Sequence, residues 1–113
     1  MVIRVRRGTT LSVTRQFLRD GAPVDLTGGS VRFRAKWKHT DADEDAVVEK
    51  STALGGVSLL DAEEGLFSVD FSASETGALV AGDYAYEVQA TEAGGDETLV
   101  DDGALVVSAG MEL

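Results

Sequence analysis

The stretch that decides the fold of this chain is Val31-Arg32-Phe33-Arg34-Ala35-Lys36-Trp37-Lys38. Apolar and basic residues alternate through all eight positions. Because successive side chains of a β-strand point to opposite faces, this alternation predicts a strand with one buried face and one charged face. The buried face is expected to contain Val31, Phe33, Ala35 and Trp37. The outer face is expected to be a basic stripe of Arg32, Arg34, Lys36 and Lys38.

The same period of two recurs along the rest of the chain. Further strands are expected within residues 3–6, 11–17, 46–51, 57–60, 67–71, 83–92 and 97–109. Turn signals that contain glycine separate several of them, at residues 20–23, 61–65 and 93–96. About seven or eight short strands with turns at this spacing are typical of a β-sandwich or a small barrel. The sequence therefore predicts an all-β fold, formed by a single domain over residues 1–113.

One short segment has a helical signature. Ser72 is followed three residues later by Glu75, which fits a capping box, and Gly82 fits the end of the turn. A piece of this length needs packing against the rest of the molecule to be stable. We therefore expect one short helical turn near residues 73–81.

The charge of the chain is divided between its two parts. The formal net charge is −10, but residues 1–38 carry nine basic and two acidic side chains, whereas residues 39–113 carry one basic and eighteen acidic side chains. Phosphate contacts need clustered Lys and Arg, so the acidic total argues against nucleic acid as a partner. Opposite charges can pair across neighbouring strands within one molecule, or they can attract a second molecule.

The residue types needed for catalysis or metal binding are scarce. The chain has no cysteine, and His39 is the single histidine, without a nucleophile or zinc ligand at a recognisable spacing. Asp41, Asp43 and Asp45 have the spacing of a calcium loop, but its required Gly and Glu positions hold Ala46 and Thr52. We therefore expect no catalytic residue, no metal and no cofactor. The longest apolar runs have four residues, so no membrane segment is expected.

The aromatic residues allow two interpretations. Trp37, Tyr84 and Tyr86 could form a platform that binds sugar, or they could pack in the core. Trp37 falls on the same side of its expected strand as Phe33, and Tyr84 and Tyr86 fall on the same side of theirs as Val88. This placement favours the core. Tyr84 begins a late strand, a position suited to a tyrosine corner in which its hydroxyl bonds to backbone.

Three motifs resemble a known family. They are Pro23-Val24-Asp25-Leu26-Thr27-Gly28, Asp61-Ala62-Glu63-Glu64-Gly65 and Ala81-Gly82-Asp83-Tyr84-Ala85-Tyr86-Glu87-Val88. In this order, with strands between them, they resemble the Ig-like β-sandwich virion proteins of tailed bacteriophages. The chain is similar to the N-terminal domain of baseplate upper proteins and to short stand-alone phage structural proteins, over most of residues 10–107.

The resemblance implies an Ig-like antiparallel β-sandwich and a structural, non-enzymatic role in the virion, assembled in the host cytoplasm. The tail or baseplate is the first expected location, and the neck or head decoration is the second. The implied partners are other virion proteins, with no nucleic acid or membrane. The alternative is a β-sandwich module for carbohydrate binding or host adhesion, which predicts outward-facing aromatic side chains.

The candidate partner-binding residues are Arg4, Arg6, Arg32, Arg34, Lys36 and Lys38. They could meet the acidic surface of the next copy, because head-to-tail contacts between unlike faces generate rings. Alternatively, Asp83 and Glu87 of a neighbouring strand could neutralise the basic stripe within the fold.

Overall fold

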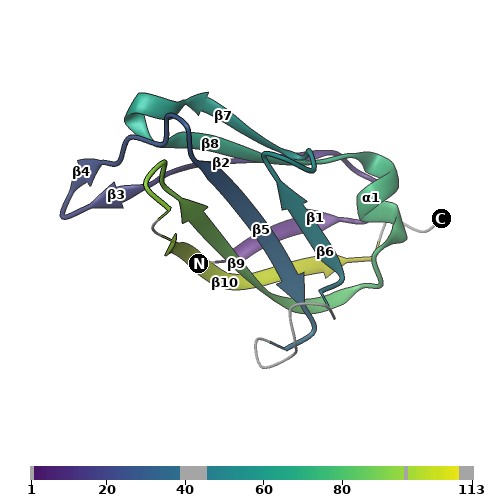
Figure 1. Ribbon diagram of the computed structural model, residues 1–113. Helices are drawn as coiled ribbons and strands as arrows, with labels where there is room; N and C mark the ends of the chain where they lie inside the picture. The colour runs from purple at the N-terminus through teal and green to yellow at the C-terminus, as the bar shows by residue number, and fades with distance from the viewer. Residues whose placement is uncertain (1, 39–45, 96, 110–113) are drawn as a thin grey trace.

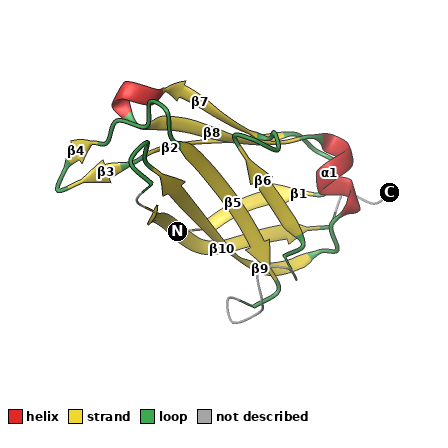
Figure 2. Ribbon diagram, viewed as in Figure 1, coloured by secondary structure: helices red, strands yellow, loops and turns green. Residues whose placement is uncertain are grey.

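A computed structural model describes residues 2–38, 46–95 and 97–109 as two β-sheets packed face to face (Figure 1). The five-stranded sheet has the order β1 (Val2–Arg6), β10 (Glu97–Ser108), β9 (Gly82–Thr91), β5 (Ser30–Lys36) and β6 (Val48–Ser51). The three-stranded sheet has the order β2 (Leu11–Gln16), β8 (Leu66–Phe71) and β7 (Val57–Asp61). Two short strands, β3 (Leu18–Arg19) and β4 (Ala22–Pro23), form a hairpin at one end of the sandwich (Figure 2).

The strand order is that of an Ig-like β-sandwich. Strands β10, β9 and β5 lie in the order of the G, F and C strands, β6 extends that sheet as C′ does, and β2, β8 and β7 match B, E and D. Tyr84 completes the pattern, since its hydroxyl donates to the Val80 carbonyl at 2.5 Å as a tyrosine corner requires. The predicted Ig-like fold and the tyrosine corner are therefore confirmed.

One strand pair departs from the antiparallel expectation. β1 runs parallel to β10, with Val2 opposite Ala104 and Arg6 opposite Ser108, so the five-stranded sheet is mixed. Alternation along a strand indicates which side chains are buried but carries no information on strand direction. From the end of β1 at the sheet edge, the chain crosses to β2 in the other sheet (Figure 1).

The core lies between the two sheets and centres on Phe33. Val31, Phe33 and Ala35 of β5 are all buried, as their alternation predicts. The centroid of the Phe33 ring lies 5.6 Å from that of Phe71 in an edge-on contact, which joins the two sheets. It lies 5.5 Å from the centroid of Tyr86 in a stacked contact within the five-stranded sheet. Because this face of β5 is buried, the charged residues that alternate with it lie on the opposite, outer face.

Trp37 is the exception, because the prediction that it is buried is wrong. β5 ends at Lys36, and the Trp37 side chain is 47% exposed. Alternation determines burial only while the strand continues. The indole ring instead stacks on Tyr84 with 4.3 Å between ring centroids. Gly82 permits this placement, since a Cβ there would come within 3.2 Å of the indole.

The helical turn forms where the capping box predicts it. Helix α1 (Ala73–Ala78) begins after Ser72, whose side chain accepts from the Glu75 amide while the Glu75 side chain accepts from the Ser72 amide. The helix ends with Leu79 as its C-cap, whereas Gly82 starts β9. The Asp61–Gly65 turn is also confirmed, as a short 3₁₀-helix η2 (Ala62–Glu64) that Gly65 ends in a left-handed conformation.

Two cationic side chains extend into the interior. Arg15 of β2 lies on the inward-facing side, and its Nε is 3.5 Å from an Asp101 carboxylate oxygen that also accepts from the Tyr86 hydroxyl at 2.8 Å. Burial and this carboxylate raise the pKa of Tyr86. Lys50 of edge strand β6 is opposite Phe33 and is buried, which protects this edge from pairing with another chain.

Candidate partner-binding face

The basic residues of β5 lie on the outer face of the five-stranded sheet, between two strands that carry acidic side chains. Arg34 is opposite Glu87 of β9 on one side and Glu49 of β6 on the other. Its guanidinium is 3.2 Å from the Glu49 carboxylate. The Nζ of Lys36 is 3.6 Å from the Glu87 carboxylate. These contacts show that two of the four residues of the basic stripe, Arg34 and Lys36, pair with carboxylates within the fold.

The expected basic stripe is therefore shorter than the alternation suggests. Lys36 is only 5% exposed, so the prediction that it stands in solvent is wrong. It is opposite the small side chain of Ala85, and its ammonium group turns to Glu87. Lys38 is exposed but lies beyond the end of β5. Of the two expected acidic partners, Glu87 forms an ion pair, whereas Asp83 is opposite Val106.

Arg4 and Arg6 form a separate group at the far edge of the same sheet. Both lie on β1 and both are exposed, with Val106 and Ser108 opposite them. β10 and β9 separate them from β5. The six candidate residues are therefore not brought together into one patch, although Arg4, Arg6, Arg32 and Arg34 share the outer face.

A strip of small apolar side chains runs from β1 across β10 to β9 on the same face. Val2, Ala104 and Ala85 are aligned across three neighbouring strands, and Val106 follows on the same face of β10. Val2 is exposed and the other three are partly exposed. The outer face thus has an apolar centre flanked by charged and polar side chains.

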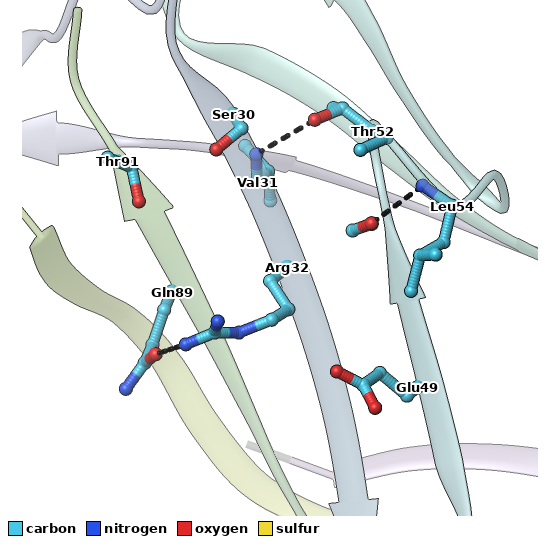
Figure 3. Close-up of a pocket in the computed structure, with 10 residues that line it drawn as sticks. Ser30, Val31, Arg32, Glu49, Thr52, Leu54, Gln89 and Thr91 are labelled. Atoms are coloured by element: carbon cyan, nitrogen blue, oxygen red, sulfur yellow. Dashed lines mark hydrogen bonds between the residues drawn. The ribbon is translucent and has the colours of Figure 1, made fainter. Parts of the chain in front are cut away.

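A shallow depression of about 270 Å³ opens on this face around Arg32. Figure 3 shows Arg32 reaching from β5 to Gln89 on the neighbouring strand β9, while Thr52 and Leu54 follow β6 on the other side. Sequence reasoning missed Gln89 and Thr52 as lining residues. The register that places Gln89 beside Arg32 depends on long-range strand pairing, which no local sequence signal records.

Several sequence hypotheses fall outside the described residues. His39 and the acidic segment 39–45, with Asp41, Asp43 and Asp45, are among them. Within residues 2–38, 46–95 and 97–109, no group of three or more potential metal-ligating side chains occurs. The helices formed by those residues are too short or too polar to cross a membrane.

The comparisons with known proteins assign this chain to no family. No protein-family model and no curated protein matches this sequence. Among solved structures, the chain is similar to murine CRIg, with 10% sequence identity and a TM-score of 0.45, over 96% of this chain and 91% of that chain. The assignment of an Ig-like β-sandwich rests on the strand order and the tyrosine corner.

Proposed function

We propose that this protein is a structural, non-enzymatic component of a tailed-bacteriophage virion that acts through protein–protein contacts. The tail or baseplate is the favoured location, and the neck or head decoration is the second. Its partners would be other virion proteins, with several copies in one particle. The resemblance of the turn and strand motifs in residues 23–28, 61–65 and 81–88 to such proteins supports this proposal.

The observation that carries the proposal is the composition of the outer face of the five-stranded sheet. Its apolar strip of Val2, Ala85, Ala104 and Val106 is bordered by Arg4 and Arg6 on one side and by paired charges on the other. An apolar centre with a polar rim is the usual anatomy of a protein–protein interface. A partner that covers the strip would bring acidic side chains to Arg4 and Arg6.

Two measurements test the proposal. Mass spectrometry of phage particles purified from the source should detect the protein at many copies, and its absence from intact particles would overturn the virion role. Light scattering should separately detect self-association or binding to a neighbouring virion protein. The Arg4→Glu/Arg6→Glu variant should weaken that contact at least tenfold. Thr14→Glu, on the exposed face of the other sheet, is the control and should leave it unchanged.

One observation favours the second candidate, a carbohydrate-binding or host-adhesion module. Trp37 is exposed and stacked on Tyr84, which provides the outward aromatic surface that this function requires. A glycan array with reproducible hits would support it, and Trp37→Ala should then abolish binding while Trp37→Phe retains part of it. Reproducible hits that survive Trp37→Ala would rule out this surface as the binding site.

A further inference from the structure

Arg32 differs from its neighbours on β5 in having uncharged residues on both sides. Gln89 lies opposite it on β9, and Ser51 lies opposite it on β6. Arg34, two residues later, has Glu87 and Glu49 in the corresponding positions. The charge of Arg32 is therefore left without a carboxylate partner among the residues that the structure describes, although the side chain is partly buried.

The Arg32 guanidinium is nevertheless held in one orientation. One terminal nitrogen donates to the Gln89 side-chain oxygen, and the other is turned away from Gln89 (Figure 3). A guanidinium has five N–H donors in a rigid planar fork. Within the described part of the chain, the bond to Gln89 is its one side-chain hydrogen bond, so donors remain available toward the depression.

Hydroxyl groups line the depression around this cation. Ser30 and Thr91 lie at one end, and Thr52 lies across β5 from them (Figure 3). The Thr52 oxygen accepts from the Val31 amide at 3.4 Å, which leaves its hydroxyl proton free to donate elsewhere. The Thr91 hydroxyl already donates to the Glu97 carboxylate at 3.5 Å, so the depression offers the Arg32 cation together with the hydroxyl groups of Ser30 and Thr52.

We propose that the depression around Arg32 is a binding site for a carboxylate group. A planar carboxylate matches the guanidinium fork, and a charge-assisted pair of this kind is stronger than a neutral hydrogen bond. Leu54, which is 74% exposed on the rim, can contact the carbon atoms that carry the carboxylate. This inference stands whether or not the protein is a virion component.

Glu49 gives the site a preference among anions. Its carboxylate lines the same depression and is held by two Arg34 nitrogens at 3.3 and 3.2 Å. A second negative charge at this position opposes a dianion more than a monoanion. The site should therefore bind a carboxylate in preference to inorganic phosphate.

Titration followed by NMR tests the proposal on the intact protein. Adding acetate should shift the Arg32 Nε–H signal in a saturable way, with a Kd of about 0.1 M, the weak range expected for one charge-assisted pair that water can reach. Inorganic phosphate should bind at least fivefold more weakly. Arg32→Gln should abolish the response elsewhere in the depression, and Arg32→Lys should reduce it at least fivefold. Arg4→Gln is the control and should leave the response intact, because Arg4 lies at the other edge of the sheet.

Further titrations distinguish the source of the carboxylate. If the Arg32 signal moves when the protein is diluted without acetate, the group comes from a second copy of this chain. If it moves only with acetate or with an N-acetyl-aspartyl amide, the group is a free ligand or belongs to a different partner. A linear response shared by all exposed arginines would overturn the proposal, as would an unchanged response of the other depression residues in folded Arg32→Gln.

Discussion

Replacing Glu75 by glutamine should destabilise the protein by about 2 kcal/mol, although the two side chains have the same shape. Lys50 is only 4% exposed, and its ammonium group bonds to one Glu75 oxygen while lying 5.0 Å from the Phe71 ring centroid. The other Glu75 oxygen accepts from the Ser72 amide at 2.9 Å. A glutamine has one oxygen, so it can serve either Ser72 or Lys50, and the buried cation loses its counter-ion.

The magnitude follows from the exposure of the two partners. Removing one member of a fully buried ion pair costs about 3–5 kcal/mol, because the remaining charge stays buried. Here the Glu75 side chain is 48% exposed, so water reaches the pair and reduces the loss to about 2 kcal/mol. For a domain of this size that loss lowers Tm by about 8 °C. Lys50→Met added to Glu75→Gln removes the unpaired charge and should recover most of the stability.

The Glu75–Lys50 pair also makes the stability of the protein depend on pH. The hydrogen bond from Lys50, followed by that from the Ser72 backbone, lowers the pKa of Glu75 below its ordinary value of 4.5. A carboxyl group whose pKa is lower in the folded state contributes stability above pH 4.5 and loses it as the pH falls through the folded value. The stability gap between wild type and Glu75→Gln should therefore narrow as the pH falls below 4.5.

Urea denaturation at several pH values between 7 and 3 measures both effects, with Glu63→Gln as an exposed control that should match wild type. A Glu75→Gln stability within 0.5 kcal/mol of wild type at pH 7 would refute the reasoning. A stability gap of the same size at pH 7 and pH 3 would also refute it.

Three further substitutions test the core, the tyrosine corner and a tight turn by the same denaturation assay. Phe33→Ala should cost about 3–5 kcal/mol, because its ring is fully buried between the sheets, and a loss below 1 kcal/mol would contradict its central position. Tyr84→Phe should cost about 1 kcal/mol through loss of the bond to the Val80 carbonyl, whereas no change would mean that water replaces this bond without loss. Gly65→Ala should cost more than about 1 kcal/mol, because its φ is 69° and a Cβ would meet a backbone oxygen at 2.7 Å; unchanged stability would show that the turn rearranges easily.

The sequence predicts the parts of this fold that depend on local patterns. Alternation identifies the buried side of β5, and the spacing of Ser72 and Glu75 locates helix α1. The prediction that Trp37 is buried is wrong because alternation indicates burial only within a strand, and β5 ends at Lys36. The prediction that Lys36 is exposed is wrong because its burial depends on a carboxylate of β9, a strand about fifty residues later in the chain.

The candidate site is harder to predict than the fold for the same reason. The depression at Arg32 requires the pairing of β5 with both β6 and β9, and register between distant strands is set by the assembled core. The neutral residues beside Arg32 and the acidic residues beside Arg34 are therefore visible only once the sheet is formed. The sequence indicates that basic residues line one face but not which of them is neutralised.

The parallel pairing of β1 with β10 has a mechanical consequence. Residue pairs from Val2 with Ala104 to Arg6 with Ser108 join an early strand to a late one, and both strands point the same way. Tension that pulls Val2 and Ser108 in opposite directions therefore acts along both strands and loads the hydrogen bonds between them in shear. These bonds must break together, whereas bonds loaded end-on open one after another. A chain held at these two points should resist extension until the β1–β10 pair fails as a unit.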